Sequence, residues 1–205
     1  MLVNLTVTEL LTKTASGEPV PGGGSISALN AAMAAALTEM VAGVTIGKKG
    51  YENVEEDMKN VARKASALRD KLTGEIDRDA DAYSQVVAAF KLPKATGAEK
   101  KQRAEAIQEG LKEATRVPLC VAKDAVTLMD LIEIAVKKGN KNAASDGVVA
   151  AMAARTAVLG ALYNVKINLD SIKDTDFVSQ ITAEIAELDV RVKNKEKDII
   201  NAIQL

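Results

Sequence analysis

Two aspartates stand where a carboxyl group could do acid–base chemistry. Asp79 lies on the apolar stripe of a long helical pattern, four residues before Tyr83. Burial there would raise the pKa of its carboxyl group, and carboxyls with shifted pKa values are concentrated at functional sites. Asp146 follows Ser145 in the first turn of a later helical pattern, where free N–H groups and the helix dipole favour an ionised carboxylate. Two such carboxyls could divide acid and base work, whereas a buried structural aspartate and ordinary helix capping are the alternatives.

A glycine-rich turn is the second candidate. Pro19-Val20-Pro21 leads into Gly22, Gly23 and Gly24, and Ser25 then opens an alanine-rich apolar run. The glycines leave a bare backbone whose N–H groups suit an anion or polar ligand at a helix N-terminus. We expect Ser25 to cap that helix. The alternative interpretation is a tight loop that lets two helices pack closely.

Cationic side chains offer two further sites. Lys91 and Lys94 flank a Leu-Pro pair at the end of the long helical pattern. Positive charge there complements a helix C-terminus, and a site for a substrate carboxylate is the functional alternative. Arg155 is in register with an apolar face, so it could pair with Asp79 or an acidic substrate, or keep its head group in water at a helix edge.

Composition removes several kinds of chemistry. The 205 residues include no histidine, which excludes histidine bases, His-dependent triads and histidine zinc sites. Cys120 is the single cysteine, so no intrachain disulfide or Cys-rich metal site is expected, and an inert buried thiol is predicted. A net charge of −1 gives no electrostatic footprint for nucleic acid or an anionic membrane. We therefore expect no metal, no nucleic acid, no membrane and, without a secretory pattern at the N-terminus, a cytoplasmic location.

The elements that must position these residues are helical throughout, because the helix period recurs and no strand-like alternation stands out. Thr6 and Glu9 form a capping box for a short first helix. Residues 25–46 are predicted to be a buried core helix, since Glu39 would be costly inside a membrane. An apolar stripe from residue 54 to residue 90 predicts one amphipathic helix about 50 Å long, which Pro93 ends.

The second half of the chain continues the pattern. A charged helix is expected over 98–116, and Pro118 is expected to begin a separate helix that Gly139 ends. Ser145 is expected to cap a helix over 146–166, and a last helix contains Phe177 and Ile199. The fold class is therefore all-α: one domain over residues 1–205, a bundle of about six to seven helices with one long central helix. The alanine-rich core, with only 2% aromatic residues, favours close packing and a helical dimer.

Several segments together resemble the cyclodeaminase/cyclohydrolase family of folate enzymes, which includes the C-terminal half of formiminotransferase-cyclodeaminase. They occur in the family order and span nearly the whole chain: ASGEPVPGGGSISAL (15–29), DRDADAYSQVVAAFKLPKAT (77–96), LKEATRVPL (111–119), SDGVVAA (145–151) and YNVKINLDSI (163–172). The resemblance implies an all-helical fold, a homodimer and a folate pocket.

The resemblance implies one of two reactions. The first, which we favour, closes 5-formimidoyltetrahydrofolate to 5,10-methenyltetrahydrofolate and releases ammonia. The second interconverts 5,10-methenyl- and 10-formyltetrahydrofolate with water. Neither needs a metal or redox cofactor. The chain carries no formiminotransferase half, so a formiminotransferase partner would be a separate chain, and the pathway stays open between histidine degradation and other one-carbon metabolism.

The resemblance also suggests roles for the candidate residues. Asp79 and Asp146 would move the protons, with the choice of acid and base left open. Gly22, Gly23, Gly24 and Ser25 would supply amides and a hydroxyl to the substrate. The other candidate substrate-binding residues are Lys91, Lys94 and Arg155 for the glutamate tail, Asn142, Asn164 and Asn168 for the pterin, and Tyr83 and Ser145. For each asparagine, hydrogen bonding at a loop or helix end is the alternative. A non-catalytic folate-binding protein and a helical dimerisation module are the competing interpretations of the whole chain.

Overall fold

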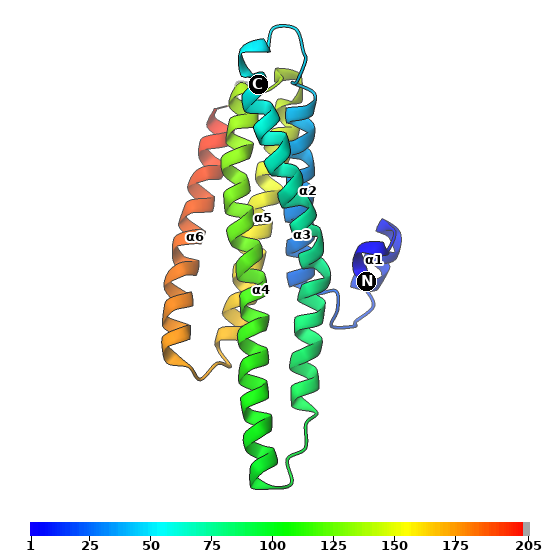
Figure 1. Cartoon of the computed structure of the whole chain (residues 1–205), viewed down its shortest axis with the longest axis vertical. Helices are drawn as coiled ribbons and strands as arrows, with labels where there is room; N and C mark the ends of the chain where they lie inside the picture. Colours follow the sequence, from blue (N-terminus) through cyan, green and yellow to red (C-terminus); the bar gives the residue numbers. More distant parts are fainter. Residues whose placement is uncertain (203–205) are drawn as a thin grey trace.

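Long antiparallel helices form the molecule, and no strand occurs in residues 1–202, which the computed structural model describes. The α-helices are α1 (Val7–Thr14), α2 (Gly23–Gly43), α3 (Glu55–Phe90), α4 (Gly97–Lys138), α5 (Ala144–Leu169) and α6 (Thr175–Asn201). Single 3-10 turns cover Leu2–Asn4, Glu52–Val54 and Lys141–Ala143. Five helices form an elongated bundle, while α1 stands outside it, on the side of α2 and α3 (Figure 1). The predicted all-α fold is confirmed.

The helix starts follow local capping chemistry. Thr6 and Glu9 make both hydrogen bonds of the predicted capping box at α1. Thr96 and Glu99 make the same box at α4, and the carboxylate of Asp174 accepts from the N–H of Phe177 at α6. These starts are specified within four residues of sequence, because each cap bonds an N–H group of the first turn.

The core is built largely from small side chains. Fully buried alanines run along α2 and α5, and the core continues with Met58, Leu72, Met129 and Ile132 from the two longest helices. Gly160 of α5 lies so close to α2 that a Cβ atom there would come 2.4 Å from Ser27 Oγ. The alanine-rich composition therefore gives the close helix packing that it predicts.

Two helical stretches reach the length and mean hydropathy of a membrane span, namely Gly23–Gly43 and Lys141–Leu169. The bundle buries 50% and 44% of their most apolar windows. Both pack against other helices of the bundle, α2 against α3 and α5, and α5 also against α4. This agrees with the prediction of a core helix for the first of them.

The prediction of two helices on either side of Pro118 is wrong. The chain runs as one helix, α4, with Pro118 buried inside it. Proline has no N–H group and so leaves the carbonyl of residue i−4, here Ala114, without its helical donor. The side chain of Asn168 replaces that donor, since its Nδ2 lies 2.8 Å from the Ala114 oxygen. A side chain from α5 thus allows α4 to continue through the proline.

Candidate active site

The glycine turn places the first turn of α2 against α3. Gly22 is the N-cap residue, and no side chain caps the helix, so the prediction that Ser25 caps it is wrong. Ser25 instead lies inside the helix, fully buried, and its Oγ donates to Asp79 Oδ2 at 2.9 Å. The hydroxyl group therefore bonds a carboxyl from another helix rather than its own backbone.

Gly24 is required by the position of Asp79. A Cβ atom on Gly24 would lie 2.0 Å from Asp79 Oδ1 and 2.5 Å from its Cγ, distances that no side chain could occupy. The backbone of α2 and the carboxyl of α3 are thus in direct contact. Only glycine permits this approach. Gly24 and Ser25 together therefore form the binding surface for the Asp79 carboxyl.

The surroundings of Asp79 shift the pKa of its carboxyl group. Desolvation by burial raises the pKa of Asp79 above its ordinary value, and hydrogen bonds from the hydroxyl and backbone of Ser25 act in the opposite direction. The net effect favours the protonated form, which the off-pattern position of Asp79 predicts. The shift is in the direction that suits a general acid.

Asn164 approaches the same place from α5. Its Nδ2 donates to the carbonyl oxygen of Gly160 at 2.9 Å, and a Cβ atom on Gly23 would lie 3.1 Å from that nitrogen. Within residues 1–202, no hydrogen bond is donated to Asn164 Oδ1. Three helices thus bring Asp79, Asn164 and the exposed N-terminus of α2 together.

Asp146 lies at the opposite end of the helix pair formed by α2 and α5. It is eighteen residues before Asn164 on α5, which separates them by about 27 Å along the helix. α5 begins at Ala144 with Ala143 as its N-cap and no side-chain cap, so the prediction that Ser145 caps it is wrong. Asp146 does occupy the first turn as predicted, but the structure does not bring Asp79 and Asp146 together within one chain.

Two further candidates have structural contacts away from the site. Arg155 forms an ion pair with Glu196 of α6, with Nε and Oε2 2.9 Å apart, rather than with Asp79. Asn142 is exposed in the turn Lys141–Ala143, and its N–H group donates to the side chain of Asn140. Asn168, in turn, is bonded to the Ala114 carbonyl. All three residues therefore make structural contacts at helix edges or ends, which is the alternative to a role in substrate binding.

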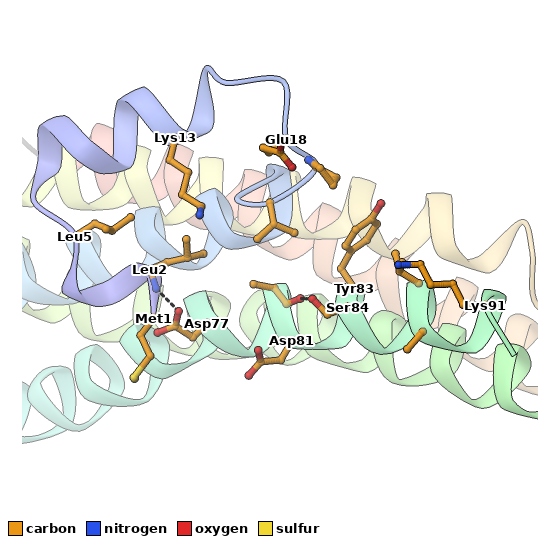
Figure 2. A pocket seen from close by; sticks show the side chains of 15 residues that line it. Met1, Leu2, Leu5, Lys13, Glu18, Asp77, Asp81, Tyr83, Ser84 and Lys91 are labelled. Atoms are coloured by element: carbon orange, nitrogen blue, oxygen red, sulfur yellow. Dashed lines mark hydrogen bonds between the residues drawn. The ribbon is translucent and has the colours of Figure 1, made fainter.

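Tyr83 and Lys91 line a cavity of about 880 Å³ between α3 and the N-terminal arm, which comprises Met1–Leu5 and α1 (Figure 2). Lys94 is exposed beyond the end of α3 and does not line this cavity. The arm is held where the N–H group of Leu2 donates to Asp77 Oδ1. This cavity was not predicted, although apolar Leu2 and Leu5 before the capping box are a signal that the arm packs against something.

The single thiol is not part of this site. Burial raises the pKa of Cys120, which lies beside Asp124 on α4, so the thiol stays protonated at neutral pH. The raised pKa agrees with the predicted inert role, whereas the prediction of a buried thiol is wrong, because Cys120 is partly exposed. Among residues 1–202, no three histidine, cysteine, aspartate or glutamate side chains cluster as a metal site would require.

Comparison with known proteins gives a consistent result. A family profile described as formiminotransferase-cyclodeaminase matches residues 6–187. A methenyltetrahydrofolate cyclohydrolase of Methylorubrum extorquens is 40% identical, over 98% of this chain and 100% of its own length. A formimidoyltransferase-cyclodeaminase of Sus scrofa is 36% identical over 92% of this chain, which spans only 35% of that longer protein. The crystal structure of a formiminotetrahydrofolate cyclodeaminase from Thermotoga maritima shares 31% identity, with a TM-score of 0.89 over 98% of this chain and 97% of its own.

Proposed function

The chain belongs to the formiminotransferase-cyclodeaminase family, and on that premise we propose that it converts 5-formimidoyltetrahydrofolate to 5,10-methenyltetrahydrofolate and ammonia. The observation that carries the proposal is the carboxyl of Asp79, seated on Gly24 and Ser25 with its pKa raised by burial. A carboxyl whose protonated form is favoured by burial is suited to donate a proton to a departing nitrogen.

In this reaction N10 loses one proton, and the exocyclic =NH group gains two before it leaves as ammonia, so one proton is taken up overall. N10 of the folate attacks the formimidoyl carbon and loses its proton to a base. The bond from that carbon to the exocyclic nitrogen then breaks, and this nitrogen leaves as ammonia after an acid protonates it. We assign the acid role to Asp79. The N–H groups at the start of α2 and the carboxamide of Asn164 are placed to orient the polar edge of the pterin.

We assign the base role to Asp146, and this requires a second subunit. Exposed apolar side chains run along the outer faces of α2 and α5: Met33, Met40, Val149, Met152, Tyr163 and Ile167. Such a surface supports the predicted homodimer, since large exposed apolar patches mark interaction sites. A two-fold axis that crosses α2 and α5 at right angles would place opposite ends of these helices from the two subunits side by side. That symmetry would bring Asp146 of the partner subunit towards Asp79.

A cyclohydrolase activity is the second candidate. The relative from Methylorubrum extorquens, aligned over its whole length, is named for that reaction. The same two carboxyls would serve it, because a base would activate water for attack on the methenyl carbon and an acid would protonate N5 as its bond to that carbon breaks. The two reactions differ in the small molecule involved: the cyclohydrolase adds water to the one-carbon unit, whereas the cyclodeaminase releases ammonia from it.

The proposed reactions consist of proton transfers and bond exchange at carbon, so we propose that they need no metal or redox cofactor. We also propose a cytoplasmic location, because the two most apolar helices serve the bundle core. We propose a formiminotransferase on a separate chain as a partner that supplies the substrate. The pathway, histidine degradation or another one-carbon route, follows from which substrate is used.

The decisive experiment offers the purified protein 5-formimidoyl- and 5,10-methenyltetrahydrofolate, and measures ammonia and 10-formyltetrahydrofolate separately. Release of ammonia supports the cyclodeaminase, and 10-formyl product alone supports the cyclohydrolase. Folate binding without either product overturns both in favour of a binding protein. Absence of binding by calorimetry favours a structural dimerisation module.

A mixing experiment tests the shared site. Asp79→Asn and Asp146→Asn homodimers should each be nearly inactive. Exchanging their subunits creates heterodimers with one doubly substituted site and one intact site, so about a quarter of wild-type turnover should return at full exchange. No recovery, with subunit exchange demonstrated, would contradict the partner assignment of Asp146.

A further inference from the structure

The first turn of α2 is in contact with two other helices. Asp79 of α3 touches this turn at Gly24 and Ser25, whereas α5 touches it at Gly23 and Ser27. Residues 23 and 27 share one face of α2, because they are four positions apart in the helix. The contact with α5 therefore lies on a different face of the turn from the contact with Asp79.

Four residues make a closed set of contacts between α5 and this turn. Ser27 is 5% exposed, and its Oγ donates to the Gly23 carbonyl at 2.7 Å. Gly160 lies against that hydroxyl, because a Cβ atom on Gly160 would come 2.4 Å from Ser27 Oγ. The Gly160 carbonyl accepts from Asn164 Nδ2 at 2.9 Å, and the carboxamide of Asn164 lies beside Gly23. We call Gly23, Ser27, Gly160 and Asn164 the α5 clamp.

The hydrogen bond within the α5 clamp spans the residues that touch the carboxyl. It joins Ser27 to the Gly23 carbonyl, so Gly24 and Ser25 lie between its two ends in the sequence. A serine within a helix often bonds the carbonyl four residues earlier, and that bond alone would be ordinary helix packing. Here the same hydroxyl also sets the separation of α2 and α5, since a side chain at Gly160 would collide with it.

The contact between this turn and Asp79 tolerates little movement. A Cβ atom on Gly24 would lie 2.0 Å from Asp79 Oδ1, and Ser25 Oγ donates to Oδ2 at 2.9 Å. A displacement of the turn by about 1 Å would take the second contact beyond hydrogen-bonding distance. Misplacement of reacting groups by about 1 Å can lower a rate by about 10²-fold. The position of the turn against α5 therefore matters for chemistry at Asp79.

From these contacts we propose that the α5 clamp holds Asp79 in its reactive position, with Ser27 and Gly160 as positioning residues that act through Gly24 and Ser25. The proposal rests on the proposed acid role of Asp79. It adds two residues that form no hydrogen bond with the Asp79 carboxyl within residues 1–202.

The first test adds a methyl group to α5. In Gly160→Ala the new Cβ atom collides with Ser27 Oγ, so the first turn of α2 must move. We expect kcat per folded molecule to fall by about 10²-fold. Gly74→Ala is the control, because Gly74 lies on α3 with nothing within 4 Å of an added Cβ atom. An unchanged kcat in folded Gly160→Ala would overturn the proposal.

A second substitution should reverse the effect of the first. Ser27 Cβ would lie 3.6 Å from the new methyl group, which is an ordinary van der Waals distance. Ser27→Ala removes only the colliding oxygen, so the double variant with Gly160→Ala should regain the kcat of Ser27→Ala alone. This pair of variants also tests the proposal where Gly160→Ala by itself does not fold. A folded double variant with a far lower kcat than Ser27→Ala would contradict the proposal.

Thr38 provides the matched control for the Ser27 hydroxyl. It is buried on α2, eleven residues after Ser27, and its Oγ1 donates to the Ala34 carbonyl at 2.7 Å, which is the same kind of bond in the same helix. Ser27→Ala should lower kcat by about fivefold, as expected for loss of one hydrogen bond. Thr38→Val should leave kcat unchanged. Equal kcat values in these two variants would show that Ser27 serves helix packing alone.

A spectroscopic measurement separates this proposal from the proposed reaction. The carboxyl carbon of Asp79 reports its own protonation by NMR without any turnover, and Asp79→Asn assigns the signal. Burial is the largest cause of the raised pKa of Asp79, so water admitted by Gly160→Ala should lower that pKa, and the double variant should restore it. An unchanged pKa in folded Gly160→Ala refutes the α5 clamp and leaves the reaction standing. A pKa that follows the substitutions, in a protein without turnover, supports the α5 clamp and refutes the reaction.

Discussion

The two ends of α2 both hold buried polar groups, but only one end holds them at an energetic cost. Beyond the C-terminal end, Thr45 Oγ1 donates to the Val41 carbonyl at 2.7 Å and accepts the N–H group of Asn140 at 2.8 Å. The Asn140 side chain donates to the Val44 carbonyl. Here each buried group completes the hydrogen bonding of another, as structural polar clusters do.

At the N-terminal end the arrangement is different. Asp79 presses a titratable carboxyl against Gly24, and burial raises the pKa of that carboxyl despite the hydrogen bond from Ser25. A core carboxyl that resists ionisation weakens the fold at neutral pH. A cost of this kind is common where a group is retained for chemistry rather than for packing.

The largest difference between the two ends should appear when Asp79 is replaced by Asn. This change keeps the shape of the side chain beside Ser25 but removes the acidic proton. Turnover should fall by about 10³-fold, within the range of general acid–base catalysis. Steady-state kinetics against Asp70→Asn, an exposed position on the same helix, gives the comparison. Near-normal turnover in Asp79→Asn would show that this carboxyl is structural, like the cluster at Thr45.

Adding a single methyl group at each end of α2 is the next test. Gly24→Ala should cost about 1–3 kcal/mol in the free energy of unfolding, because the new Cβ atom collides with Asp79, and turnover should fall with the displaced carboxyl. Gly43→Ala, where nothing lies within 4 Å of the new atom, should raise that free energy by up to about 1 kcal/mol. Urea denaturation measures both. Similar stability changes at the two glycines would contradict the direct contact at Gly24.

The cluster at the C-terminal end can be broken separately. Thr45→Val removes the acceptor of the Asn140 N–H group and should cost about 1–3 kcal/mol in the free energy of unfolding. The kcat per folded molecule should stay unchanged, since this cluster has a structural role. A fall in kcat without loss of stability would place the Thr45 end in the catalytic machinery.

The smallest effect concerns pH. Because the pKa of Asp79 in the folded state lies above its ordinary value of 3.8, its contribution to stability is fully present below about pH 4 and is lost as pH rises through the folded-state pKa. The free energy of unfolding of the wild type, minus that of Asp79→Asn, should therefore decrease over this interval and level off above it. Chemical denaturation at a series of pH values measures the difference, in which the opposite slopes of carboxyls with lowered pKa values, such as Glu133, cancel. A difference that increases with pH would contradict burial as the dominant influence on Asp79.

The sequence was sufficient for most of the helices because their signals are local. The capping box at Thr6 acts within one turn, and the apolar stripe of α3 repeats every three to four residues. Pro118 was misleading for the same reason, since its local preference is to begin a helix. The Ala114 carbonyl, which Pro118 leaves without its helical donor, accepts a hydrogen bond from Asn168, 54 residues away in sequence, and no local pattern contains that contact.

The sequence by itself therefore determined the helical content of the chain, the length of α3, and the presence of a carboxyl on its apolar face. Tertiary structure decided which groups that carboxyl meets. The contact of Asp79 with Gly24, the distance that separates it from Asp146, and the pairing of Arg155 with Glu196 depend on how whole helices pack. The physical reason is range: helix signals act over about four residues, whereas a site forms where side chains from several helices converge.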